Sequence, residues 1–338
     1  MLERPDVHDD LLLDGLRRGW MLQAEQVEFL PLGADSGTAV FHAVTGDGRS
    51  YFIKLRRTFN PAALRLAQWL LAAGCTAVLA PLETVSGAGW LALDGWTMLV
   101  YPFVDGADAG QVGLSASQRA ALGAALRAIH QARPPQTQLD QLPREDFDGR
   151  FRSQVRRFQA LVERQAFADP SAACLAALMR RQRAEIDRVT RRAEDLARQL
   201  ADQAAPHDWV ICHTDLHAWN LLVAGDGRLF IVEWDAPRLA PRECDLMFIG
   251  AGIDRLWPSP LETEQFYQAY AAPEAALLPV NRAALAYYRY ERIVQDFAAF
   301  GEQLLLSDAG GMDRPQAVEY FASNFAPGGT IACADQVD

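Results

Sequence analysis

Apolar and polar positions alternate along the first hundred residues with a period of two, which is typical of β-strands. The turn-forming segments GADSG (33–37) and TGDGR (45–49) separate the first three alternating runs. The pattern predicts strands at 27–32, 38–44, 50–55, 78–85 and 96–104. An amphipathic helix at 6–18 precedes the strands, and a second helix from Pro61 to Gly74 follows the third one. We therefore predict a small antiparallel sheet with one inserted helix.

The pattern changes after residue 106, where Ala, Leu, Arg and Gln recur at helical spacing. The predicted helices lie at 115–133, 145–167 and 171–204, and 243–338 is helical again. Segment 209–235 returns to strand-like runs around a Gly-Asp-Gly turn. The fold class is therefore α+β, with an N-terminal sheet lobe and a mostly helical C-terminal lobe. The predicted divisions are 1–100, a hinge at 101–106, and 107–338.

Length and composition narrow the classes of partner. A chain of 338 residues exceeds one ordinary core, which fits two lobes. The net charge of −11 disfavours nucleic acid and is compatible with a cationic small substrate. The longest uncharged apolar stretch, 66–81, is too short for a membrane span. Five scattered cysteines and no signal-peptide pattern at the start predict a cytoplasmic protein.

Chemistry-bearing residues gather in HTDLHAWNLLV (213–223), between two apolar strand-like runs. The Asp215 carboxylate can accept a proton from a substrate hydroxyl, and the Asn220 amide oxygen can bind a metal. Glu233 ends the returning run LFIVEW and is a second metal-ligand candidate. Asp245 follows in ECDLMF, where it can hydrogen-bond the backbone of this loop.

These motifs make the chain resemble the aminoglycoside phosphotransferases, which are small-molecule kinases with a bilobal, protein-kinase-like fold. The pattern H-x-D-x-x-x-x-N is present at 213–220, a strand lysine is present at Lys54, and LVYPFVDG occupies the hinge position. The segments APRECDLMFIGAG, YYRYERIVQDF and FGEQLL are similar to the spectinomycin phosphotransferase branch. The resemblance covers roughly the whole chain, from residue 10 to 330.

The resemblance implies transfer of the γ-phosphate of ATP or GTP to a hydroxyl of a cationic aminocyclitol or aminoglycoside such as spectinomycin, as in antibiotic resistance. Asp215 would position and deprotonate the hydroxyl, while Asn220 and Glu233 would hold Mg²⁺. Lys54 would grip the nucleotide phosphates. Lys54 is the only lysine among 32 basic side chains, and the wide guanidinium of arginine does not replace a compact ammonium. We expect a monomer.

The resemblance also implies a nucleotide site in the sheet lobe. Backbone N–H groups of Ser36 and Gly37 would cradle phosphate oxygens. Phe52 shares a strand face with the lysine two positions later and would cover the adenine. Tyr101 and Phe103 in the hinge would offer backbone groups to the base.

The sequence departs from the family pattern at two positions. The helix after the lysine normally supplies a glutamate to pair with it, but here the best-aligned residue is Gln68, which can accept one hydrogen bond and carries no charge. The metal-binding aspartate before tryptophan is replaced by Glu233, and Asp235 is our second choice for that ligand. His213 is expected to support the catalytic loop.

Three alternatives remain at this stage. A pseudokinase that binds nucleotide without turnover is motivated by the two departures. Kinases of choline, homoserine or other small alcohols share the same motifs. A metallohydrolase is the remote alternative, because His213 and His217 are four residues apart with Asp215 between them, which resembles zinc-ligand spacing.

Overall fold

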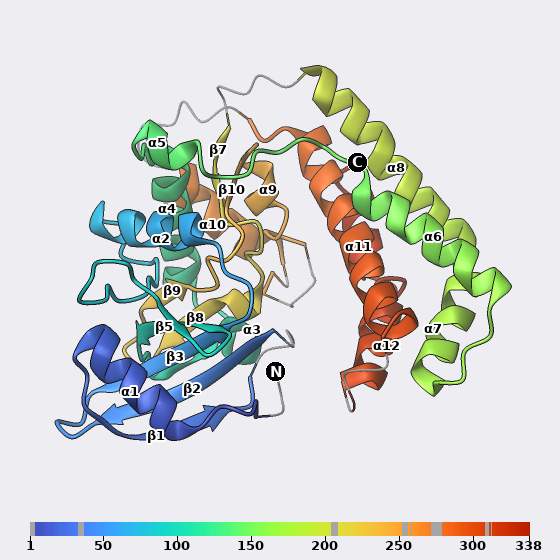
Figure 1. The fold of residues 1–338 in the computed structure, drawn as a ribbon. Helices are drawn as coiled ribbons and strands as arrows, with labels where there is room; N and C mark the ends of the chain where they lie inside the picture. The colour runs from blue at the N-terminus through green and yellow to red at the C-terminus, as the bar shows by residue number, and fades with distance from the viewer. Residues whose placement is uncertain are drawn as a thin grey trace. The chain divides into compact units, whose positions relative to one another are not determined.

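The computed structural model describes residues 4–32, 37–203, 209–251, 256–257, 259–271, 279–307, 311 and 313–338. The chain forms two compact units, here called the first and second unit (Figure 1). The first comprises 1–143 and 218–237, and the second comprises 144–217 and 238–338. The boundary between them falls inside the HTDLHAWN motif, after His217. The predicted lobes and hinge stay a prediction.

The first unit contains the predicted antiparallel sheet. Its elements are α1 (Asp9–Trp20), β1 (Ala24–Leu30), β2 (Thr38–Thr45), β3 (Ser50–Arg56), α2 (Pro61–Ala72), β4 (Leu91–Leu93), β5 (Trp96–Pro102), β6 (Gly106–Asp108), α3 (Ala109–Val112), α4 (Ala116–Gln131), α5 (Gln136–Leu139), the 3₁₀ helix η2 (Ala218–Asn220), β8 (Leu221–Ala224) and β9 (Leu229–Ile231). The strand order of the larger sheet is β1-β2-β3-β5-β4, and every neighbouring pair is antiparallel. Helix α2 follows the third strand, as predicted.

One face of this sheet carries the core of the first unit. Ile53 and Leu55 of β3 are fully buried with Leu12 and Leu16 of α1. Full burial of such a side chain stabilises the fold by about 1.5–3 kcal/mol. Because side chains alternate along a strand, Phe52 and Lys54 lie on the opposite face of β3. The sequence period therefore fixes which side of the sheet receives the lysine.

Local signals explain α2. The Asn60 side chain accepts a hydrogen bond from the Ala62 N–H (3.0 Å), and Pro61 occupies the first helical position. After the helix, Gly74 has φ +97°, the left-handed conformation that glycine adopts without strain.

The predicted strand at 78–85 is wrong. Within it, Val78 forms only an isolated bridge with Ile231 of β9, and a short strand forms later, at β4. Pro81 cannot donate to a ladder. The Thr84 hydroxyl instead accepts hydrogen bonds from the Ala88 and Gly89 N–H groups, which closes a turn.

The second unit is mainly helical, as predicted. Its elements are α6 (Arg150–Arg164), α7 (Pro170–Arg181), α8 (Arg183–Gln203), β7 (Val210–Cys212), β10 (Arg238–Ala240), α9 (Glu243–Leu246), α10 (Pro260–Ala271), α11 (Arg282–Leu305), α12 (Asp313–Ser323) and α13 (Thr330–Asp335). Strands β7 and β10 pair antiparallel. No helix among the described residues is long and apolar enough to cross a membrane.

Helix α11 is the centre of the second unit and runs alongside α6 and α8 (Figure 1). Gly301 permits a close approach there, because a Cβ at this position would overlap the Phe158 ring of α6. The single helix predicted at 171–204 is divided at Gln182 into α7 and α8. The Arg180 guanidinium donates to the Val162 carbonyl oxygen (2.9 Å) at the end of α6, a tertiary contact that the apolar spacing does not reveal.

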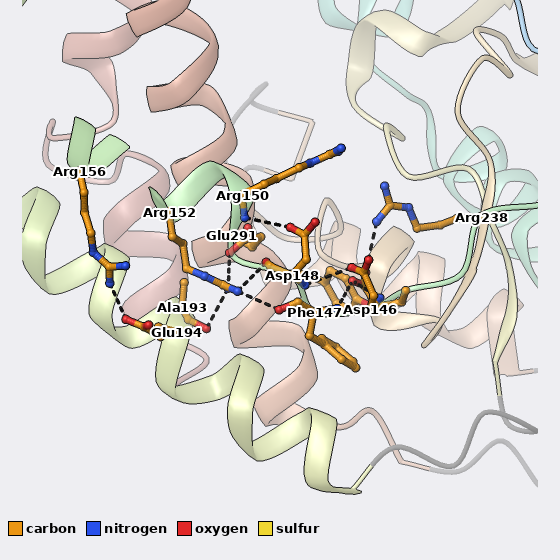
Figure 2. A network of polar contacts seen from close by, with 12 residues as sticks. Asp146, Phe147, Asp148, Arg150, Arg152, Arg156, Ala193, Glu194, Arg238 and Glu291 are labelled. Carbon is orange, nitrogen blue, oxygen red and sulfur yellow. Dashed lines mark hydrogen bonds and ion pairs between the residues drawn. The ribbon is translucent and has the colours of Figure 1, made fainter. Parts of the chain in front are cut away.

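A buried ion pair joins three helices of this unit (Figure 2). Arg152 of α6 donates to the Glu291 carboxylate of α11 at 2.8 Å. The same guanidinium donates to the carbonyl oxygens of Phe147 (2.8 Å), Asp148 (2.5 Å) and Ala193 of α8 (3.4 Å). Both terminal nitrogens of this arginine therefore have acceptors, as a buried cation requires.

Burial raises the pKa of Glu291 to about 7, although the Arg152 charge opposes the shift. Because the folded-state pKa lies above the unfolded one, this group contributes stability that is fully present below about pH 4.3. That stability is lost as the pH rises through 7. The expected loss is about 4 kcal/mol, since each pKa unit corresponds to about 1.4 kcal/mol.

Candidate active site

Two carboxylates converge on the only lysine, within the first unit. Lys54 is 3% exposed, and its ammonium donates to Glu233 Oε2 at 2.5 Å and to Asp235 Oδ2 at 2.9 Å. Arg56, two residues along the same face of β3, also forms an ion pair with Asp235. Burial opposes ionisation of Asp235, yet the Lys54 and Arg56 charges outweigh it and hold its pKa below the usual range.

The backbone places the two carboxylates by an irregular turn. Strand β9 ends at Ile231, so the strand does not reach Glu233 as predicted. Glu233 has φ +65°, which is uncommon for a residue with a side chain, and its carbonyl oxygen accepts from the Asp235 N–H (2.9 Å). A residue keeps such an unfavourable backbone conformation only where surrounding contacts hold it there, and residues of this kind cluster at functional sites. The turn brings both acids to one ammonium, which strand alternation would not explain.

Three residues that were predicted to lie near the nucleotide have defined contacts in the first unit. Gln68 donates to the Pro81 carbonyl oxygen (3.1 Å), and the charge of Lys54 is balanced instead by the two carboxylates after β9. This differs from the contact expected for Gln68, because its amide is held by its own neighbouring loop. Phe52 and Tyr101 are direct partners in the β3–β5 ladder, with ring centroids 6.3 Å apart.

The other residues assigned to nucleotide binding lie in the same unit. The Phe103 N–H donates to the Ser50 carbonyl oxygen (3.2 Å), and its ring lies 4.3 Å from that of His42. The Gly37 carbonyl oxygen accepts from the Arg57 N–H (2.9 Å). Ser36 lies outside the described residues.

The start of the HTDLHAWN motif belongs to the second unit and is held by one carboxylate. Asp245 is fully buried and accepts from the N–H groups of His213 (2.9 Å) and Thr214 (2.7 Å). This confirms the predicted hydrogen bonds between Asp245 and the loop backbone. Thr214 has φ +78°, a rare conformation for a β-branched residue. His213 is buried, and its Nδ1 accepts from the Asp215 N–H (3.3 Å).

Each oxygen of the Asp215 carboxylate has a partner in the second unit. Arg292 of α11 donates to Oδ1 at 2.6 Å, and His217 Nε2 lies 3.3 Å from Oδ2. The Arg292 Nε donates to Asp296, one helical turn further along α11, at 3.1 Å. Burial opposes ionisation of Asp215, but the hydrogen bond to His217 and the Arg292 charge hold its pKa well below the usual range. Asp215 is therefore a stable anion.

The end of the motif lies in the first unit. Asn220 is buried at the end of η2, and its carbonyl oxygen accepts from the Val232 N–H (3.0 Å). This bond ties Asn220 to the segment that carries Glu233 and Asp235. Carboxylate and amide oxygens are hard donors that suit Mg²⁺, and two of the three candidates already converge on one cation. The donor set of the first unit therefore fits magnesium.

Sequence reasoning missed Arg292 and Asp296. The available signal was an Arg and an Asp at i, i+4 in YYRYERIVQDF, within a helix whose neighbouring positions are largely apolar. That spacing predicts the pair on α11. It does not predict that the guanidinium also reaches Asp215, which lies 77 residues earlier in the chain.

The chain is similar to known phosphotransferases in sequence and in structure. Residues 28–285 match the phosphotransferase enzyme family. The crystal structure of spectinomycin phosphotransferase APH(9)-Ia in complex with ADP and spectinomycin is 29% identical, with a TM-score of 0.90 over 98% of this chain and 99% of that chain. Its AMP-bound complex is 28% identical, with a TM-score of 0.85 over 97% and 98%. No curated protein matches this chain.

An aminoglycoside phosphotransferase from Alicyclobacillus acidocaldarius is 15% identical, with a TM-score of 0.62 over 99% of this chain and 98% of that chain, a likeness of fold alone. The predicted kinase-like α+β fold is confirmed by these neighbours. The family match also favours phosphotransfer over the metallohydrolase alternative. It covers well over half of the sequence, and the chain therefore belongs to the phosphotransferase enzyme family.

Proposed function

We propose that this protein transfers the γ-phosphate of ATP to a hydroxyl group of an aminocyclitol of the spectinomycin type. The observation that carries the proposal is the similarity over nearly the entire length to a spectinomycin phosphotransferase bound to ADP and spectinomycin. A choline kinase from Streptococcus pneumoniae is 18% identical, with a TM-score of 0.56 over 93% of this chain and 98% of that chain. That lower similarity supports a shared fold only.

In the proposed reaction, the acceptor hydroxyl donates a hydrogen bond to the Asp215 carboxylate. Because Arg292 and His217 hold this carboxylate as an anion, it orients the hydroxyl and takes its proton as the hydroxyl oxygen bonds to the γ-phosphorus and the bond from that phosphorus to the ADP leaving group breaks. The low pKa makes Asp215 a weak base. This suits phosphoryl transfer, whose loose transition state depends more on positioning than on early proton removal. Asp215, Arg292 and Asp296 together carry one net negative charge, which favours a cationic acceptor.

The first unit would bind the nucleotide. Lys54 would donate to phosphate oxygens from the face of β3 opposite the core, and Phe52 would cover the base. When bound, Mg²⁺ neutralises phosphate charge. Asn220 and Glu233 would hold it, with Asp235 as the alternative carboxylate. Glu233 and Asp235 already balance the Lys54 ammonium, so the acid that is absent from α2 is not needed to keep this lysine charged.

We further propose that the enzyme depends on magnesium and works as a cytoplasmic monomer that protects its host from an antibiotic. The five cysteines are free in the structure, in line with a reducing compartment. GTP is the alternative donor. Dependence of turnover on magnesium and the molecular mass in solution would test the first two points directly.

The decisive experiment is a phosphoryl-transfer screen of spectinomycin, aminoglycosides, choline and homoserine with ATP and with GTP. We expect kcat/KM to be highest for spectinomycin with ATP. Asp215→Ala should abolish turnover while nucleotide binding persists, because Asp215 belongs to the acceptor side of the proposed site. Asp226→Ala, which removes an exposed carboxylate in the β8–β9 turn, is the matched control.

Three outcomes would change the assignment. Preferred phosphorylation of choline or homoserine would select the small-alcohol alternative. Nucleotide binding without transfer to any acceptor would select the pseudokinase. Near-normal kcat in Asp215→Ala would remove this residue from the reaction.

A further inference from the structure

Arg292 connects the candidate catalytic carboxylate to the central helix of the second unit. Its Nη1 donates to Asp215 at 2.6 Å and its Nε donates to Asp296 at 3.1 Å. The two contacts use different nitrogens of the same guanidinium, so they restrain its rotation as well as its position. The Phe248 ring lies beneath the cation, 5.7 Å from the ring centroid. The arginine is thus restrained by contacts on three sides.

The pKa values of Asp296, Arg292 and Asp215 show how neighbouring charges and burial act on each group. Burial raises the pKa of Asp296, although the Arg292 charge opposes the shift. Burial also works against ionisation of Arg292, but the two carboxylates outweigh it and raise the pKa of the guanidinium. The pKa of Asp215, in contrast, lies below its usual range, because the hydrogen bond to His217 and the Arg292 charge outweigh burial. Among the described residues, charged or titratable groups near Asp215 include His217, Arg292 and, through Arg292, Asp296, together with His213, whose Nδ1 accepts from the Asp215 N–H.

The surroundings favour an indirect role for this arginine. Phe248, Arg292 and Asp296 line a cavity of about 10 Å³, which has room for about one water molecule. A substrate ring or ammonium group does not fit in that space, so this cavity is not a substrate site. The charged partners of the guanidinium are the carboxylates of Asp215 and Asp296, which favours an effect on the reaction through Asp215.

We propose that Arg292 is a positioning residue of the phosphotransfer reaction: it fixes the orientation of the Asp215 carboxylate that receives the acceptor hydroxyl, and Asp296 anchors it. This inference rests on the proposed function. Without Arg292, Oδ1 of Asp215 loses its charged partner, and only the contact with His217 still orients the carboxylate. The hydroxyl would then meet a carboxylate that samples several rotamers and gains a proton more readily.

The experiment compares Arg292→Met with Arg282→Met, the same change at an exposed position near the start of α11. Steady-state kinetics with ATP and the best acceptor would be measured from about pH 3 to 9, so that the acid limb falls within the range, with thermal unfolding of each variant. We expect Arg292→Met to lower kcat by roughly 10- to 100-fold, with the KM for ATP within about twofold of wild type. The acid limb of kcat should move up by at least about one pH unit, because Asp215 loses the cation that lowers its pKa. Arg282→Met should match wild type.

Arg292→Lys covers the case in which Arg292→Met does not fold. The lysine ammonium keeps the positive charge. It lacks the planar geometry with which the guanidinium contacts Asp215 and Asp296 at the same time. We expect the acid limb to stay near that of wild type while kcat falls by about 3- to 30-fold.

Each result has a defined meaning. Wild-type kcat and an unmoved acid limb in Arg292→Met would overturn the inference, and so would a kcat within about twofold of wild type in Arg292→Lys. A lowered melting temperature with unchanged kinetics would assign Arg292 to stability alone and would also overturn it. Failure of wild type to phosphorylate any acceptor would instead reject the proposed function.

Discussion

Glu233 and Asp235 share one ammonium but differ in their other contacts, and this difference predicts separable effects. Glu233 pairs with Lys54 and is 42% exposed, whereas Asp235 pairs with both Lys54 and Arg56 and is 32% exposed. We therefore expect Glu233 to be the acid that can turn to a metal, and Asp235 to be the acid that balances the two cations of β3. The test variants are Glu233→Gln and Asp235→Asn, which keep shape and remove charge.

The structure sets the expected loss of stability. Breaking a buried ion pair costs about 3–5 kcal/mol, and partial exposure lowers this for Asp235 to about 1–3 kcal/mol. Glu233 is more exposed and has one cationic partner, so its loss should cost about 0–1 kcal/mol. Urea unfolding followed by circular dichroism would measure both values. Glu28→Gln, at an exposed position of β1, is the control for a neutralised surface glutamate.

For activity we expect the opposite order: Glu233→Gln should have a larger effect than Asp235→Asn. Glu233→Gln should lower kcat/KM by about 10²- to 10³-fold, because a lost metal ligand costs several kcal/mol and each 1.36 kcal/mol is tenfold in rate. Calorimetric titration should show that magnesium no longer strengthens nucleotide binding. Asp235→Asn should keep magnesium dependence, with kcat/KM within about tenfold of wild type. Glu233→Asp should stay active, since it restores the shorter carboxylate of the family pattern.

The reverse ranking would refute this reasoning. If Asp235→Asn lost magnesium-dependent binding while Glu233→Gln retained it, the metal ligand would lie two residues further along the chain. If neither variant changed magnesium dependence, both acids would act only on Lys54.

Three further predictions concern other parts of the structure. Lys54→Arg should lower kcat/KM for ATP at least about tenfold, because the wider guanidinium does not fit the buried position of the Lys54 ammonium; unchanged kinetics would contradict this. Glu291→Gln should lose less stability than wild type between pH 5 and 8, since the ionising group is gone; equal slopes in urea unfolding would contradict it. Gly301→Ala should destabilise the protein by about 1–3 kcal/mol through overlap with Phe158; an unchanged melting temperature would contradict it.

Much of the candidate site could be predicted from short-range signals. The period of two along β3 separated Lys54 from the core face that carries Ile53. The motif HTDLHAWN lies between strands β7 and β8 as expected, while the roles of Asp215 and Asn220 stay predictions. Asp245 was predicted to hydrogen-bond this loop, and it accepts two of its N–H groups. These predictions hold because each depends on backbone geometry within a few residues or on the family motif.

Other features were missed because the apolar pattern alone does not reveal them. The strand predicted at 78–85 has suitable apolar residues, but Pro81 and the turn closed by Thr84 prevent regular pairing. The break at Gln182 leaves no mark in the apolar spacing, since the same helical period continues on both sides.

Local conformational preferences and residue spacing were enough to predict the strand faces, the helix caps, the order of the motifs and the family resemblance. Which charged side chains form ion pairs depends on the tertiary structure. Lys54 reaches Asp235 across 181 residues and Arg292 reaches Asp215 across 77. A buried charge must find a partner wherever the fold provides one, and that partner depends on how distant segments pack together.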